Sequence, residues 1–308
     1  MNPRKLPMNK ILLLIATIGF SITHVWADQP VNSNTVKNVE FDGDYYPSTT
    51  IGKYGVILLS GSGGGKLDET AKRIADMGYP VLTLAYFYED TKVGNLPTSL
   101  EMIPLEYFDA PKAWLMDRAE TRKDGVIILG VSKGAELSLV LASHDQDYKG
   151  VIAVSPSSVV WAGISPDSSS SQSPVSSWSI DGKGVPFIPL KSRDALKKAG
   201  LYKLHHLFAA SIGNADNVED ALIKVENINS PTLLISSSDD FVWSSNEMAS
   251  FICSKMNAGD KKLCTHTNFK NGSHTMRMGQ TFKSGEILEG QIADVTTEIF
   301  KFLKETNE

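Results

Sequence analysis

The sequence has little cysteine, no long apolar run and no excess of positive charge, and each shortage excludes a class of function. Only two cysteines occur among 308 residues, and no histidine pair lies near them, so the usual zinc-site spacings are missing. The formal net charge of −5 argues against a nucleic-acid partner. No uninterrupted apolar stretch reaches the length of a membrane-spanning helix. We therefore expect neither a metal site nor stable insertion in a membrane.

The first residues have the pattern of a targeting segment. Three basic residues precede the apolar run 11–20, and Val25-Trp26-Ala27 places small side chains where signal peptidases require them. The pattern predicts a signal peptide over residues 1–27 that is cleaved after Ala27, and hence a periplasmic or secreted protein. An uncleaved anchor is the alternative, although the run is short for a bilayer.

The two cysteines, Cys253 and Cys264, lie eleven positions apart, in a predicted helix and at the start of a predicted strand. An oxidising compartment would permit a disulfide between them. Two buried thiols are the alternative, and the sequence leaves both open.

Short apolar runs alternate with helical patterns along most of the chain. Strands are expected at 36–41, 56–59, 81–85, 125–130, 151–154, 232–236 and 263–269. Helices are expected at 67–77 and 105–118, from 135 onwards, and at 246–256 and 287–303. This alternation predicts an α/β fold whose mostly parallel sheet carries helices on both faces.

Residues 157–230 interrupt the alternation and are rich in Ser, Pro and Trp. The segment is too long for a simple connection, so we expect an insertion over the carboxyl ends of the strands, where ligands bind in such sheets. A mobile lid on a single domain, 28–308, is our hypothesis, and a separate domain is the alternative.

One stretch, Gly130-Val131-Ser132-Lys133-Gly134, matches G-x-S-x-G between a predicted strand and a predicted helix. That context is required by the nucleophile elbow, the strained turn that presents a catalytic serine in the α/β-hydrolase fold. The backbone N–H of Lys133 would then face a developing oxyanion from the helix N-terminus. An ordinary glycine-rich turn with a surface serine is the alternative.

A nucleophilic serine needs a base and an acid, which follow it in that fold in the order Ser, acid, His. Asp239 and Asp240 directly follow the strand 232–236, and His274 follows the strand 263–269. We predict Ser132, Asp240 and His274 as the catalytic triad, with Asp239 as the alternative acid. Other histidines are less suitable, because they lie in the signal segment, a helix, the insertion or a strand.

The glycine-rich segment 61–65 follows the strand 56–59. Its spacing fails both the phosphate-loop and the dinucleotide patterns, since Ser60, Lys66 and Leu67 occupy required positions, so no cofactor is expected. The N–H of Gly61 or Ser62 would instead supply the second oxyanion donor. A flexible turn is the alternative.

Several longer motifs resemble the family of acyl-CoA thioester hydrolases and bile acid-CoA:amino acid N-acyltransferases, in its C-terminal catalytic domain. They include GSGGG at 61–65, IPLEYFDAPKAWL at 103–115, GVSKGAEL at 130–137, SSWSIDGKGVPFIP at 176–189 and SSDDFVWSS at 237–245. The resemblance implies the same triad on Ser132, Asp240 and His274. Acyltransferase members carry cysteine as nucleophile, so Ser132 implies the hydrolase branch. Larger members add an N-terminal β-sandwich domain, for which we expect no room before Val36.

These observations predict a serine hydrolase that cleaves a small acyl thioester or ester through an acyl-enzyme. Because CoA thioesters should be scarce outside the cytoplasm, a dienelactone-hydrolase-like carboxylesterase or a peptidase is the alternative enzyme. The alternative from another class is an exported binding protein that retains the fold without activity.

Overall fold

A computed structural model describes residues 34–37, 40–88, 93–165, 173–191, 200, 204–259, 262–276 and 286–308, with side chains from 294 onwards in the last range. The described residues belong to one compact unit, Val31–Glu308. The predicted signal peptide, residues 1–27, lies outside them, so its cleavage stays a prediction.

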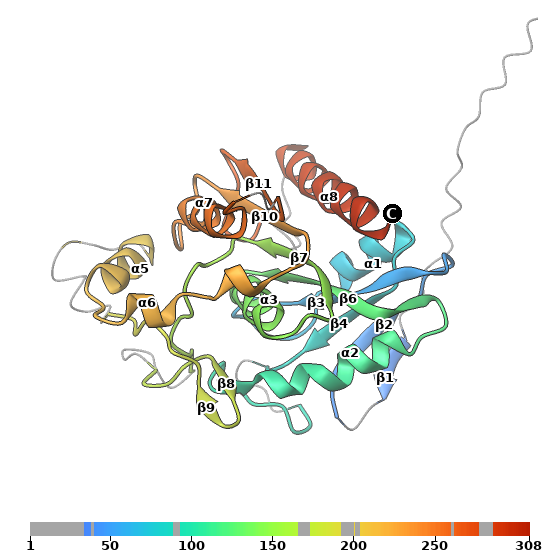
Figure 1. The fold of residues 1–308 in the computed structure, drawn as a ribbon, viewed down its shortest axis with the longest axis horizontal. Coiled ribbons are helices and arrows are strands. Elements are labelled where there is room, and N and C mark those ends of the chain that lie inside the picture. Colours follow the sequence, from blue (N-terminus) through green and yellow to red (C-terminus); the bar gives the residue numbers. More distant parts are fainter. Residues whose placement is uncertain are drawn as a thin grey trace, which may run out of the picture. The chain divides into compact units, whose positions relative to one another are not determined.

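An eight-stranded, mostly parallel sheet forms the centre of this unit (Figure 1). Its strand order is β1-β2-β4-β3-β6-β7-β10-β11. Strand β2 runs antiparallel to both β1 and β4, whereas the pairs from β4 to β11 are parallel. The bounds are β1 Asn34–Lys37, β2 Asp42–Tyr46, β3 Lys53–Leu59, β4 Val81–Ala85, β6 Thr121–Val131, β7 Tyr148–Val154, β10 Thr232–Ser237 and β11 Cys264–Phe269. The predicted parallel sheet is confirmed.

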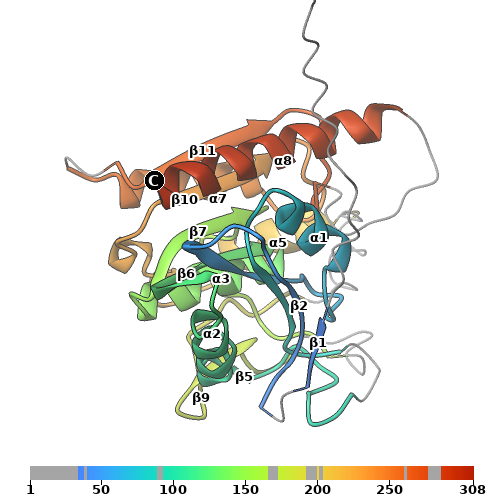
Figure 2. The same cartoon turned by 90° about the vertical axis from the view of Figure 1, so that its right-hand side faces the viewer.

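Both faces of the sheet are covered because successive residues of its central strands point to opposite sides. In β3, Ile57 and Leu59 pack in one hydrophobic cluster, and Val56 and Leu58 pack in the other. Helices α2 (Asp109–Met116), α3 (Lys133–His144) and α7 (Ser245–Met256) contribute to the first cluster. Helices α1 (Asp68–Asp76) and α8 (Glu286–Asn307) contribute to the second, and Figure 2 shows these two on the same side.

The segment 157–230 forms short elements of its own. Strands β8 (Trp178–Ile180) and β9 (Lys183–Gly184) join β5 (Ile103–Pro104) in a small sheet. Two helices, α5 (Leu204–Gly213) and α6 (Val218–Ala221), and the 3₁₀ turn η2 (Val225–Asn227) follow. A third hydrophobic cluster joins this segment to the start of α7 and the loop before it, through Val159, Trp161, Ile188, Ala221, Trp243 and Met248. Residues 166–172, 192–199 and 201–203 lie outside the described part, and the mobile lid stays a hypothesis.

Two predicted elements were wrong in detail. The strand expected at 36–41 is replaced by the antiparallel pair β1 and β2. The polar sequence DGD at the start of β2 concealed this strand, whose last two residues, Tyr45 and Tyr46, are both buried. The helix expected at 105–118 begins as a 3₁₀ turn, η1 (Leu105–Phe108), and becomes α-helical only from Asp109 to Met116.

The two cysteines form a disulfide in the structure. Cys253 lies on α7 and Cys264 opens β11, with their Cα atoms 5.1 Å apart. The bond ties an outer helix to the edge strand next to it, which resolves the choice that the sequence left open.

Candidate active site

The serine of the G-x-S-x-G motif lies in a sharp turn between β6 and α3. Ser132 has φ of 57° and ψ of −117°, a conformation that side chains rarely adopt, and it forms the N-cap of α3. The two glycines permit the turn. A Cβ on Gly130 would lie 2.0 Å from the carbonyl oxygen of Gly134, and one on Gly134 would lie 2.3 Å from that of Ser60. The motif therefore has the strained geometry of a nucleophile elbow.

The structure brings the three predicted triad side chains together from distant parts of the chain. His274 Nε2 lies 2.8 Å from Ser132 Oγ, and His274 Nδ1 lies 2.8 and 2.9 Å from the two carboxylate oxygens of Asp240. All three residues are buried. This hydrogen-bonded chain matches the arrangement in which an imidazole activates a hydroxyl while a carboxylate orients the imidazole.

The loop after β10 makes Asp240, rather than Asp239, the partner of His274. Asp240 Oδ1 also accepts hydrogen bonds from the backbone N–H groups of Val242 and Trp243, at 2.9 and 3.3 Å, whereas the Asp239 side chain is exposed. Burial opposes ionisation of Asp240, but its hydrogen bonds, that with His274 foremost, hold the pKa of this carboxyl below its ordinary value. The carboxylate is therefore ionised at neutral pH.

Other residues hold His274 in place, and sequence reasoning missed them. The Ser155 hydroxyl donates to the His274 carbonyl oxygen, and the Ser237 hydroxyl donates to that of Gly272 at 2.6 Å. The Trp243 ring meets the imidazole edge to face, with centroids 4.7 Å apart. Trp243 in turn donates to the Pro156 carbonyl at 3.1 Å. In the sequence, only the short distance from Asp240 to Trp243, three residues, indicated that this ring could lie near the site.

Two of the three predicted oxyanion donors, Lys133 and Gly61, lie next to Ser132. Lys133 follows it as the first residue of α3, and the first N–H groups of a helix have no partner within the helix. Gly61 lies beside the serine, because a Cβ there would be 3.2 Å from Ser132 Cβ and 3.7 Å from its Oγ. Ser62 follows in an exposed turn. The donor role of Lys133 and of Gly61 or Ser62 stays a prediction.

The remaining described histidines lie elsewhere. His144 ends α3, and His205 and His206 lie in α5. On β11, the His266 ring bonds the Ser236 hydroxyl at 2.7 Å, and burial lowers its pKa. None of these contacts involves the serine at the elbow.

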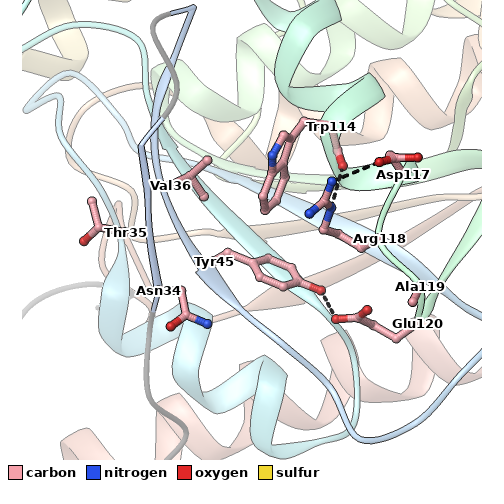
Figure 3. Close-up of a pocket in the computed structure, with 9 residues that line it drawn as sticks. All are labelled: Asn34, Thr35, Val36, Tyr45, Trp114, Asp117, Arg118, Ala119 and Glu120. Atoms are coloured by element: carbon pink, nitrogen blue, oxygen red, sulfur yellow. Dashed lines mark hydrogen bonds and ion pairs between the residues drawn. The ribbon is translucent and has the colours of Figure 1, made fainter.

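A pocket of about 720 Å³ is lined by residues that include none of the triad (Figure 3). Its walls include Tyr45, whose hydroxyl bonds Glu120, and Trp114, whose ring stacks against Arg118. Glu120 precedes the first residue of β6 and Ser132 follows its last, so the pocket and the serine lie at opposite ends of this strand. The pocket is therefore no part of the triad site.

Two features are absent from the described ranges. Within them, no cluster of three or more His, Cys, Asp or Glu side chains is placed to hold a metal ion. Nor does any helix there combine the length and apolar character needed to cross a membrane.

Comparisons with solved structures identify the fold. An esterase from Pyrococcus furiosus aligns over 89% of this chain and 90% of its own, with a TM-score of 0.54 and 14% identity. The α/β hydrolase GrgF from a Penicillium species aligns over 89% of this chain and 98% of its own, with a TM-score of 0.56 and 12% identity. At such low identity the likeness shows the fold alone. The predicted α/β-hydrolase fold is confirmed.

Comparisons of sequence identify the family. Human mitochondrial acyl-coenzyme A thioesterase 2 is 28% identical over 212 residues, which are 68% of this chain and 39% of that protein. Mouse acyl-coenzyme A thioesterase 5 is 40% identical over 99 residues, or 32% of this chain and 22% of that protein. The chain thus spans less than half the length of these relatives. The family described as BAAT / acyl-CoA thioester hydrolase C terminal matches residues 103–280. The chain therefore belongs to the BAAT / acyl-CoA thioester hydrolase family, by way of that C-terminal domain.

Proposed function

We propose that this protein is a serine hydrolase that cleaves a small acyl thioester or ester. The observation that carries the proposal is the buried chain of hydrogen bonds from Ser132 through His274 to Asp240. A serine in a strained elbow, at the N-terminus of a helix, has few structural reasons to hydrogen-bond a buried imidazole. The family of the chain supports the same reaction class.

The proposed reaction has two halves. In the first, His274 Nε2 takes the Ser132 proton while Oγ attacks the acyl carbonyl, and backbone N–H groups stabilise the tetrahedral oxyanion. The imidazolium then gives that proton to the leaving thiol or alcohol, and an acyl-enzyme remains. In the second half, His274 deprotonates a water molecule that attacks the acyl-enzyme. The imidazolium then returns that proton to Ser132 Oγ as the tetrahedral intermediate collapses, which releases the acid and restores the free enzyme.

The proposed substrate class follows from the relatives, which are named as acyl-coenzyme A thioesterases. An acyl thioester is therefore the first substrate to test. If the chain is exported, as residues 1–27 predict, CoA thioesters should be scarce around it, and a carboxylester, another thioester or a small amide becomes the competing substrate.

The nucleophile is tested by Ser132→Ala, with Ser143→Ala as the control. Ser143 is also a buried serine, near the other end of α3, where its hydroxyl bonds the Val140 carbonyl at 2.7 Å. We expect Ser132→Ala to lose hydrolysis of p-nitrophenyl esters and labelling by a fluorophosphonate, with an unchanged melting curve. Ser143→Ala should keep both. Full activity in Ser132→Ala would refute the triad, and a wild-type protein that neither hydrolyses nor labels would indicate a binding protein.

The substrate is tested with a panel of acyl-CoA thioesters, p-nitrophenyl esters and aminoacyl amides. Turnover of acyl-CoA at the highest kcat/KM would support a thioesterase. Turnover of short esters with inert acyl-CoA would favour the carboxylesterase, and turnover of the amides would favour the peptidase.

The compartment is tested separately. We propose that residues 1–27 are removed on export, so intact mass measurement of protein recovered from the periplasm or medium should give a chain that begins at Asp28. Recovery of the uncleaved chain from the membrane fraction would support the anchor instead.

A further inference from the structure

We propose that the ion pair of Lys133 and Glu136 is a positioning device, which holds the backbone N–H of Lys133 where the oxyanion forms. The inference rests on the proposed function, because it concerns the same site. Lys133 directly follows Ser132, and Glu136 lies one turn further along α3. Neither residue is needed for the proton transfers of the triad.

The pair is buried and closely bonded. Lys133 Nζ lies 2.6 Å from both carboxylate oxygens of Glu136, and the two side chains are 3% and 0% exposed. Glu136 Oε1 also accepts the indole N–H of Trp178 at 2.7 Å and the backbone N–H of Trp161 at 3.2 Å. The ammonium group lies 5.2 Å from the centre of the Trp178 ring.

The stability of the fold is not a sufficient reason for a buried ion pair. Desolvation of two charges offsets most of their attraction, so a buried ion pair adds little to stability compared with apolar residues of the same size. Burial accordingly lowers the pKa of Lys133 and raises that of Glu136. A pair at this position, next to the strained serine, is better explained by the geometry that it maintains.

The bonds of the two side chains hold Lys133 in one position. The Lys133 side chain is tied to Glu136, and Glu136 is tied to Trp161 and Trp178, both from the inserted segment. These bonds restrict rotation of the Lys133 backbone, which carries the N–H that the oxyanion requires. An oxyanion hole acts through donors already in place, so looser anchoring should slow the reaction more than it weakens substrate binding.

The other end of the same helix offers a matched control. Lys112 is also buried, and its ammonium group contacts Asp145, the residue that follows α3. Asp109 and Asp147 lie 3.5 and 3.6 Å from this ammonium group, and the centre of the Tyr148 ring lies 5.6 Å from it. Lys112 lies on α2 and Asp145 follows Ser132 by thirteen residues, beyond the far end of α3, so the loss of this second lysine–carboxylate pair should affect stability alone.

The experiment compares Glu136→Gln, the double variant Lys133→Met with Glu136→Gln, and the control double variant Lys112→Met with Asp145→Asn. The single variant leaves a buried ammonium without its carboxylate and should be the least stable. The double variant removes both charges and should regain stability, which separates folding from positioning. Its kcat for an activated ester should nevertheless stay about tenfold to 100-fold below the wild-type value, with KM changed less than about twofold.

An alkyl boronic acid provides the second readout, because its tetrahedral adduct with Ser132 places an oxygen in the oxyanion position. Its affinity should fall with kcat in the first double variant and stay unchanged in the control. Wild-type kcat and boronate affinity in the folded double variant would overturn the proposal and leave the pair a purely structural role. A wild-type protein without activity or labelling would instead refute the proposed function, so the two failures are distinguishable.

Discussion

The choice between two adjacent carboxylates shows how much a single side chain decides in this site. Asp239 and Asp240 follow the same strand and are equally suited by position in the sequence. Only Asp240 turns inward, where it bonds His274 and two backbone N–H groups. The sequence predicted Asp240 with Asp239 as the alternative, the family resemblance supported Asp240, and the packing of the loop supplies the physical reason.

We therefore expect Asp240→Asn to lower kcat by about 10³-fold to 10⁴-fold, because the amide cannot hold the imidazole in the required tautomer. Asp239→Asn, one position away and exposed, should stay within about twofold of the wild-type protein. Steady-state hydrolysis of a p-nitrophenyl ester measures both. Equal losses in the two variants would contradict the assignment of the acid.

The strand-to-helix turn from β6 to α3 depends on atoms that a side chain would displace. Gly130→Ala places a Cβ against the Gly134 carbonyl, which belongs to the backbone and cannot rotate away. We expect a loss of about 3 kcal/mol or more in the free energy of unfolding, measured by urea titration. Gly213→Ala, at the end of α5 with nothing within 4 Å of its added Cβ, should change little and serves as the control. A stable Gly130→Ala protein would show that the turn is looser than this geometry implies.

The histidine of strand β11, His266, should make the stability of the fold sensitive to pH. Burial lowers the pKa of His266, so the folded protein favours its neutral ring. The stability from this residue is complete above the ordinary histidine pKa of about 6.5 and is lost as the pH falls through the lowered value. Urea unfolding at pH 7.5 and 5 should therefore show a smaller loss on acidification in His266→Gln than in the wild-type protein. His144→Gln, which changes an exposed histidine, should behave like the wild-type protein.

The disulfide between Cys253 and Cys264 links two elements at the edge of the compact unit. In the chain-entropy account, closing a loop of this length stabilises the folded state by about 3 kcal/mol. We expect the double variant Cys253→Ser with Cys264→Ser to lose that amount of unfolding free energy and so to unfold at a lower urea concentration, with kcat unchanged because neither residue contacts the triad. Treatment of the wild-type protein with a reductant should reproduce the loss, and an unaltered midpoint in both cases would contradict it.

The insertion 157–230 contacts the surroundings of the site in two places. Trp161 and Trp178 bond Glu136 at the start of α3, and Trp161 also packs near Trp243, which touches His274. The sequence predicted an insertion near the carboxyl ends of the strands, but nothing in its composition indicated which side chains would make these contacts.

The sequence was sufficient for the parallel sheet, its covering helices and the elbow, because these depend on residues close together in the chain. Apolar runs of β-branched residues favour buried strands, and the two glycines of G-x-S-x-G permit one particular turn. Tertiary structure alone decided the edge hairpin of β1 and β2, the disulfide, the inward turn of Asp240 and the bonds of Glu136 to two tryptophans. The bonds of Glu136 join segments far apart in the chain, and the turn of Asp240 is a choice between equivalent neighbours. The strand pair and the disulfide join segments close in the chain, but they depend on how β2 and β11 dock on the rest of the sheet. Local patterns carry no information on such contacts, since the energy that selects them arises only when the surrounding core has closed.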